Sequence, residues 1–153
     1  YNAAAGGEVN VVTKMKETNT VIGGEGNGGV IYPESHYGRD ALVGVGLFLS
    51  HFVAEGKSMT VLKATYPQYF ISKNKLTLSP DMDVDKILEG LKKKYASEEI
   101  TDIDGVKIDF KDGWVHLRKS NTEPIIRIYS ESKDEAAANQ LAEEVIKVAQ
   151  SLY

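Results

Sequence analysis

The chain has 153 residues, of which 42% are hydrophobic and 26% charged, and its formal net charge is -4 at pH 7. It is long enough to bury the core of one ordinary domain or two small ones, and its composition resembles that of a soluble cytoplasmic protein. The acidic balance argues against a nucleic-acid partner, because such binders usually carry a basic excess. The absence of cysteine excludes disulfides and thiolate metal sites, and no apolar run reaches the roughly 18 residues of a membrane span.

The first part of the chain shows three helical patterns. Apolar spacing predicts a short amphipathic helix over 9–17, an apolar helix over 40–54 and another short helix over 58–64. Because 40–54 is apolar on nearly every face, we expect that helix to be buried. Val21-Ile22 and Val30–Tyr32 are typical of brief strands, and they flank a glycine-rich segment, Gly23–Gly29.

The second part is more regular. An amphipathic helix is predicted over 84–95, and strands over 100–103, 106–110, 114–117 and 125–129, with Asp-Gly turns at 104–105 and 112–113. A long amphipathic helix is predicted over 133–152. The charge balance also shifts, from 7 Lys and Arg against 6 Asp and Glu over 1–80 to 11 against 16 over 81–153.

These patterns divide the chain into 1–68, an extended linker over 69–80, and 81–153. The expected fold class is an α/β piece followed by a small α+β domain, in which an antiparallel sheet packs against two helices. Because the chain begins at Tyr1 with a patternless small-residue stretch, we expect it to be a piece of a longer protein.

A polar turn between two apolar strands is the first candidate site. The sequence around it reads Leu117-Arg118-Lys119-Ser120-Asn121-Thr122-Glu123-Pro124-Ile125-Ile126-Arg127. Two hydroxyls and an amide on successive residues, with an arginine on either side, are the donors that a phosphate monoester requires. The alternative is a hairpin turn in which these side chains only satisfy their own backbone. The two arginines favour the phosphate site, since a turn alone does not need them.

The glycine-rich segment is the second candidate. Its glycines let a ligand approach the backbone closely, and they frame the two functional side chains Glu25 and Asn27. A carboxylate and an amide at this spacing can hydrogen-bond adjacent sugar hydroxyls. A flexible connector is the alternative, and neither nucleotide-binding glycine motif is present. No metal site is predicted, because the histidines have no ligand spacing and Asp81, Asp83 and Asp85 suit the start of a helix.

Together the two loops resemble those of the α-D-phosphohexomutases, the family of phosphoglucomutase, phosphomannomutase and phosphoglucosamine mutase. Residues 118–124 with Arg127 resemble the phosphate-binding loop of the family's fourth domain, and Gly24–Gly29 resembles the sugar-binding loop of its third domain. Lys14–Thr18 and Gly38-Arg39-Asp40 also lie where the family has such segments. Asn27 and Gly29 depart from the family's usual Ser and His, a variant that resembles the phosphoglucosamine mutase branch.

The resemblance implies an isomerase of carbohydrate metabolism that interconverts hexose 1-phosphate and hexose 6-phosphate through a hexose 1,6-bisphosphate. It implies that 1–68 belongs to the third domain and 81–153 is the fourth. Arg118, Ser120, Asn121, Thr122 and Arg127 would bind the phosphate that is not reacting, and Glu25 and Asn27 would bind sugar hydroxyls. The phosphoserine loop and the Mg²⁺ ligands would lie in missing N-terminal domains, so the fragment alone is expected to be inactive.

Two rival classes remain open. A stand-alone sugar-phosphate-binding regulatory module would use the same loops without catalysis. A structural interaction protein would leave both loops without a ligand and would show a large exposed apolar patch.

Overall fold

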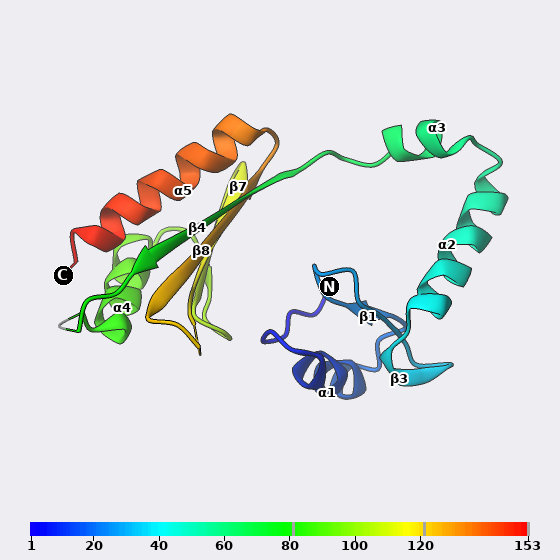
Figure 1. Ribbon diagram of the computed structural model, residues 1–153, viewed down its shortest axis with the longest axis horizontal. Coiled ribbons are helices and arrows are strands. Elements are labelled where there is room, and N and C mark those ends of the chain that lie inside the picture. The colour runs from blue at the N-terminus through cyan, green and yellow to red at the C-terminus, as the bar shows by residue number, and fades with distance from the viewer. Residues whose placement is uncertain (81, 121, 153) are drawn as a thin grey trace. The chain divides into compact units, whose positions relative to one another are not determined.

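The computed structural model describes residues 1–80, 82–120 and 122–152, and Figure 1 shows its elements in chain order. The chain forms two compact units, Tyr1–Pro67 and Gln68–Tyr153. Within the described residues no helix is both long and apolar enough to span a bilayer.

The first unit is built on a small antiparallel sheet. Helix α1 (Glu8–Thr18) precedes strands β1 (Gly23–Gly24), β2 (Val30–Tyr32) and β3 (His36–Arg39), which pair in the order β1-β2-β3. Helices α2 (Ala41–Glu55) and α3 (Met59–Ala64) follow. The helix predicted over 9–17 is confirmed as α1. The strand predicted at Val21-Ile22 is wrong, because it is Gly23 and Gly24 that pair with Ile31 and Val30.

Helix α2 forms where the sequence predicts a helix, but it is not buried. The carboxylate of Asp40 accepts hydrogen bonds from the Leu42 and Val43 N–H groups at 2.9 and 3.0 Å, which fixes its start. None of its residues is buried, and Leu42 and Val53 are 84% and 77% exposed. The expectation that this helix is buried is therefore wrong for the described structure. Its composition is apolar, but the described elements of this unit cover little of it.

The second unit is a five-stranded antiparallel sheet with two helices. Its strands are β4 (Phe70–Thr77), β5 (Glu99–Thr101), β6 (Val106–Phe110), β7 (Gly113–Lys119) and β8 (Ile125–Ser132), in the order β4-β8-β7-β6-β5. Helices α4 (Val84–Lys94) and α5 (Glu135–Gln150) lie on one side of it (Figure 1). The antiparallel sheet and two packed helices expected for this part are confirmed.

The expected linker over 69–80 differs from the structure. Residues Phe70 to Thr77 are extended, as predicted, but they pair along the whole of β8, from Phe70 opposite Ser132 to Thr77 opposite Ile125. Most of the segment is therefore an edge strand of the second unit rather than a connection between units.

The helix-facing side of this sheet forms a continuous apolar core. Its buried members alternate along the strands and recur along one face of each helix: Leu76, Val84, Ile87, Leu91, Val115, Leu117, Ile126, Ile128, Val145 and Ala149. Since successive strand residues point to opposite faces, Arg118, Arg127 and Lys75 lie on the other face. Helices α4 and α5 pack against the apolar face, so we call the face that carries these three residues the open face.

Candidate functional site

The two arginines of the polar turn are direct cross-strand partners. Arg118, in β7, pairs in register with Arg127, in β8, on the open face of the sheet. Their side chains are 39% and 37% exposed. Side chains at such paired positions lie about 5 Å apart at Cβ, so the two guanidiniums can reach one anion. The register thus brings together the two residues that the sequence placed on either side of the turn.

Each guanidinium also has a carboxylate partner. Arg118 Nη1 donates to Asp104 Oδ2 at 2.9 Å, and Arg127 Nη2 donates to Glu123 Oε2 at 3.4 Å. The Arg127 contact is longer, and Glu123 is 54% exposed, so this is a weak surface ion pair. An incoming anion could replace Glu123 at little cost, whereas Asp104 is fixed more firmly.

The Asp104-Gly105 turn positions Asp104. Gly105 has φ +77°, and a Cβ there would overlap the carbonyl oxygen of Leu117. Only glycine allows this close approach of the turn to β7. The His116 ring donates from Nε2 to the Asp104 carbonyl at 2.6 Å, which ties the turn to the same strand. Asp104 is therefore a structural partner of the site that the sequence pattern did not reveal.

The turn itself is stabilised by Ser120. Ser120 is 8% exposed. Its N–H donates to the Ile125 carbonyl at 3.0 Å, and its Oγ accepts from the Thr122 N–H at 3.4 Å. These are the bonds that a turn alone would use. Thr122 is exposed at the tip. Asn121, the remaining predicted phosphate ligand, lies outside the described residues.

The glycine-rich segment forms a tight hairpin loop in the first unit. The Glu25 N–H donates to the Gly29 carbonyl at 3.1 Å, the Gly28 N–H donates back to the Glu25 carbonyl at 3.0 Å, and Gly28 has φ +92°. Asn27 Oδ1 accepts from the Gly29 N–H at 2.9 Å. Because its oxygen is used within the loop, the exposed Asn27 amide has its NH₂ group to offer a ligand.

Arg39 holds Glu25 from the neighbouring strand. Arg39 Nη1 lies 3.8 Å from Glu25 Oε2, and its Nε donates to Glu8 Oε2 at 2.9 Å. The backbone N–H of Arg39, followed by its side chain, keeps the pKa of Glu8 below its usual range. A Cβ at Gly29 would lie 2.7 Å from Arg39 Cδ, so the arginine stem fills the space that a larger residue at position 29 would need.

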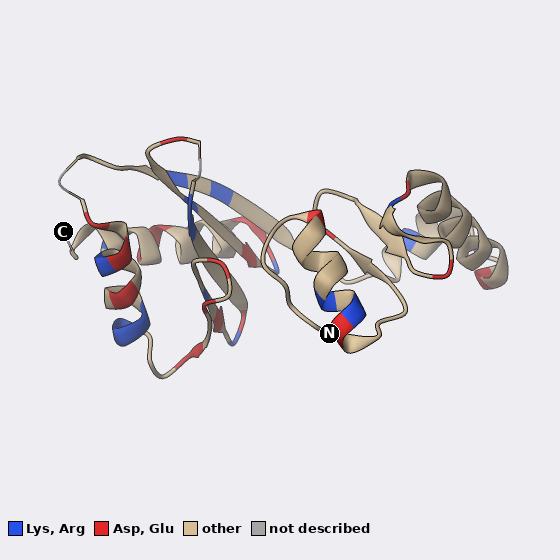
Figure 2. Cartoon of the chain, turned by 90° about the horizontal axis from the view of Figure 1, so that it is seen from below, with Lys and Arg blue, Asp and Glu red and all other residues tan. Residues whose placement is uncertain are grey.

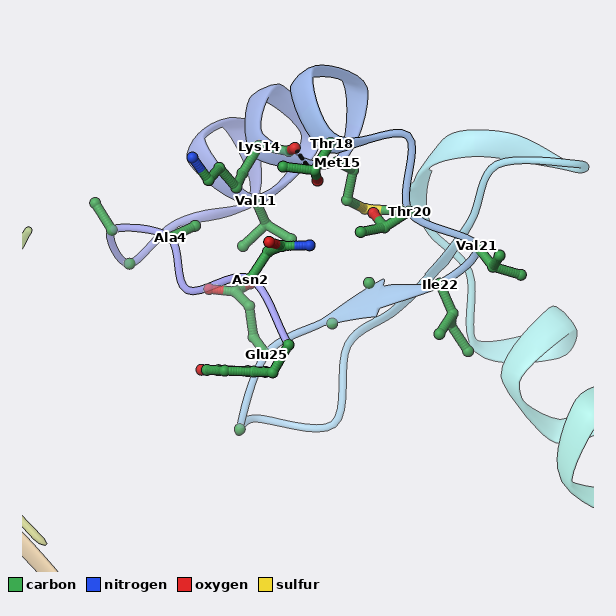
Figure 3. A pocket seen from close by; sticks show the side chains of 16 residues that line it. Asn2, Ala4, Val11, Lys14, Met15, Thr18, Thr20, Val21, Ile22 and Glu25 are labelled. Atoms are coloured by element: carbon green, nitrogen blue, oxygen red, sulfur yellow. Dashed lines mark hydrogen bonds between the residues drawn. The ribbon is translucent and has the colours of Figure 1, made fainter. Parts of the chain in front are cut away.

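A hollow of about 790 Å³ adjoins this loop. It is lined by α1, by residues 1, 2 and 4–6, and by residues 20–26. Figure 3 shows Glu25 at its edge, with Val11 and Asn2 directed toward the same space. Glu25 Oε1 accepts from the Gly7 N–H at 3.2 Å, and its side chain is only 19% exposed. The carboxylate is therefore held in place before any ligand binds.

No set of three or more imidazole and carboxylate groups in the described residues could hold a metal ion. Glu8 and Glu25 pair with Arg39, Asp104 pairs with Arg118, and Glu123 pairs with Arg127.

Comparison with known proteins divides the chain where the structure does. Residues 3–69 match phosphoglucomutase/phosphomannomutase, alpha/beta/alpha domain III, and residues 75–148 match the C-terminal domain of the same family. A phosphoglucosamine/phosphogalactosamine mutase of Sulfurisphaera tokodaii is 39% identical over 93% of this chain. A phosphoglucomutase/phosphomannomutase of Thermococcus kodakarensis is 40% identical over the same share.

The chain covers 32% and 31% of these two relatives, about a third of their length. A crystal structure of a phosphoglucomutase/phosphomannomutase family protein from Burkholderia thailandensis superposes with a TM-score of 0.71 at 25% identity, over 95% of this chain and 32% of that one. Two consecutive domains of one family thus account for nearly the whole sequence. The chain belongs to the phosphoglucomutase/phosphomannomutase family.

Proposed function

We propose that this chain is the substrate-recognising part of a phosphohexomutase that interconverts hexose 1-phosphate and hexose 6-phosphate through a bisphosphorylated intermediate. The observation that carries the proposal is the in-register pair of Arg118 and Arg127 on an open sheet face beside the Ser120–Thr122 turn. Relatives named as mutases, about three times as long as this chain, support an enzyme rather than a stand-alone regulatory module.

The second unit would bind the phosphate that is not reacting. A phosphate monoester carries nearly two negative charges at neutral pH, and guanidinium groups bind its oxygens in pairs. The strands fix the backbone positions of Arg118 and Arg127, so binding would cost little backbone conformational entropy. The donors of Ser120, Asn121 and Thr122 would complete the site from the turn.

The first unit would bind the sugar. Glu25 offers a carboxylate acceptor and Asn27 an amide donor, and the loop bonds hold both near the hairpin tip. Contacts to parts of the substrate that do not react would orient its reacting end for phosphoryl transfer. The phosphate grip must also release, because the bisphosphate has to turn round before its second end can react.

The phosphoryl transfer itself would use groups outside this chain. In the family, a phosphoserine carries the phosphoryl group and Mg²⁺ supplies electrostatic stabilisation of the transferring group. The residues described here lack a set that fits Mg²⁺. We therefore assign this chain binding and orientation only. We also propose a cytoplasmic location for the parent enzyme. As its substrate we propose an amino sugar phosphate. The phosphoglucosamine mutase names among the relatives support that choice.

The test is the activity of the complete polypeptide with hexose 1-phosphate. Replacing Arg118 or Arg127 by Ala should lower kcat/KM by about 100-fold, since a misplaced substrate loses orientation as well as affinity. Lys147→Ala, on an exposed position of α5, should leave it unchanged. The 153-residue chain alone should show no turnover. Full activity of both arginine variants, or turnover by the chain alone, would contradict the proposal.

A further inference from the structure

A row of three cationic side chains crosses the open face of the second sheet. Lys75 of β4 pairs in register with Arg127 of β8, which pairs on its other side with Arg118 of β7. The three positions belong to neighbouring strands and point to the same face. Basic positions along these strands are coloured in Figure 2.

The charges of this row do not balance within the described residues. Arg118 is paired with Asp104 and Arg127 with Glu123, so those four groups cancel. Lys75 is exposed and has no ion pair with a described carboxylate. Its neighbour along the strand, Lys73, instead lies over the Tyr129 ring, 5.8 Å from the centroid. Lys73 and Lys75 both add positive charge to this face, and Lys75 is the one directly opposite Arg127.

Such an arrangement costs stability in the absence of a ligand. Like charges at directly opposed cross-strand positions repel, and a neutral residue at position 75 would fold as well or better. A position that breaks a local rule without a compensating contact is a common mark of a functional site. An anion bound over the row would remove the repulsion.

We infer that Lys75 is a third cation of the phosphate site, an assignment that rests on the proposed function. Glu123 is the weaker of the two carboxylate partners, because its bond is 3.4 Å long and its side chain 54% exposed. When a phosphate displaces it, Arg127 and Lys75 together present two positive charges. That number matches the charge of a phosphate monoester near pH 7. Asp104 stays on Arg118 and keeps its guanidinium in place.

The site then extends sideways from the turn toward the edge strand. Thr77 lies two residues beyond Lys75 on the same face and pairs with Ile125. The carbonyl of Ile125 accepts a hydrogen bond from the Ser120 N–H. The phosphate would therefore lie over β4, β8 and β7 rather than over the turn alone. This position makes Lys75 a contact of the phosphate and gives the edge strand a role in binding.

The test is binding of inorganic phosphate to the whole chain, measured by titration calorimetry at several salt concentrations. Lys75→Gln should weaken binding about fivefold at low salt and flatten its salt dependence, since one favourable charge contact is lost. Lys75→Arg should restore most of the affinity. Lys147→Gln, which removes another exposed lysine, from α5, is the matched control and should bind as the unmodified chain does.

A second readout separates binding from stability. The only tryptophan, Trp114, lies in β7, so its fluorescence follows urea unfolding of the second unit. Without phosphate, Lys75→Gln should unfold at the same or a higher urea concentration than the unmodified chain. With phosphate, the unmodified chain should gain more stability than the variant does. A structural role for Lys75 would give the opposite result without phosphate.

The outcomes distinguish this inference from the proposed function. If Arg118→Ala and Arg127→Ala lose phosphate binding while Lys75→Gln binds normally, the assignment of Lys75 is wrong and the arginine site stands. If none of the three variants changes the affinity, both the arginine site and the role of Lys75 are wrong.

Discussion

The two units differ in how they hold their candidate ligand-binding residues. The second unit buries a continuous core between one sheet face and two helices, and Arg118 and Arg127 lie on regular strands of that sheet. In the first unit the buried hydrophobic residues among those described are Met15, Ile31 and Leu62. Asn27 and Glu25 are held by a hydrogen bond within the loop and by Arg39, respectively.

The proposed phosphate site and the proposed sugar site would therefore depend on different features of the fold. In the proposed function, phosphate binding would depend on strand register, which the core fixes and which a single surface change does not alter. Sugar binding would depend on a few exposed polar contacts, which a single substitution can alter. The first unit also exposes apolar side chains of α2, so we expect it to be the less stable of the two.

The largest predicted effect is in the core behind the arginines. Ile128→Ala removes a side chain that is 0% exposed and should cost the second unit about 2–5 kcal/mol of unfolding free energy. Urea unfolding followed by Trp114 fluorescence measures it. Leu42→Ala, at an 84% exposed position of α2, should leave that transition within about 0.5 kcal/mol. Equal losses would mean that the two units unfold as one body.

The next effect is at the Asp104-Gly105 turn. Gly105→Ala should cost about 1–3 kcal/mol, because alanine is strained at φ +77° and its Cβ would overlap the Leu117 carbonyl oxygen. The same Trp114 transition reports it, and phosphate binding should weaken as Asp104 moves away from Arg118. Gly46→Ala, where a Cβ meets nothing within 4 Å, is the matched control and should not shift the transition. An unchanged transition in the Gly105 variant would contradict the account of the turn.

A smaller effect is expected in the sugar-site loop. Gly29→Ala should displace the Arg39 stem and so loosen the 3.8 Å contact with Glu25, at a cost below about 1 kcal/mol. The NMR resonance of the Arg39 Nε–H group should move. Gly26→Ala, whose Cβ would meet nothing within 4 Å, should leave it in place. If both variants move the resonance equally, contact with position 29 is not what orients Arg39.

The smallest effect is a pH dependence confined to the first unit. Hydrogen bonds from the Val43 N–H, from His36 and from the Leu42 N–H hold the pKa of Asp40 below its usual 3.8. A lowered pKa means that the stabilisation is complete above the unfolded value and is lost as the pH falls through the folded value. The Leu42 and Val43 amide shifts should therefore titrate below pH 3.8, and Asp40→Asn should abolish that titration. A midpoint at or above 3.8 would contradict the cap.

Much of the second unit could be predicted from sequence because its signals are local. Helical periodicity predicted α4 and α5, and Asp-Gly turns separated β5, β6 and β7. The errors concern features set by distant partners. Apolar content did not show whether anything covers α2, and the extended form of 69–78 did not show that β8 pairs with it.

The candidate site shows the same contrast between local signals and features set by distant partners. The residues flanking the turn were visible as a motif, and the register brings Arg118 and Arg127 together as expected. The sequence did not reveal that Asp104 contacts Arg118 or that Lys75 lies opposite Arg127, because each belongs to another strand or turn that only the fold brings close. Ile71, Lys73, Lys75 and Thr77 occupy every second position of the extended segment. This spacing could have placed Lys75 on one face of a strand.

The most direct test of the central claim is an NMR titration of the isotope-labelled chain with inorganic phosphate. The account predicts shifts concentrated at the Ser120 and Thr122 amides and at the guanidinium groups of Arg118 and Arg127, with none along α4 and α5, and their loss when both arginines become alanine. Saturable shifts confined to residues away from this turn and from the neighbouring positions of β4, β7 and β8, or the same affinity in the double variant, would contradict it.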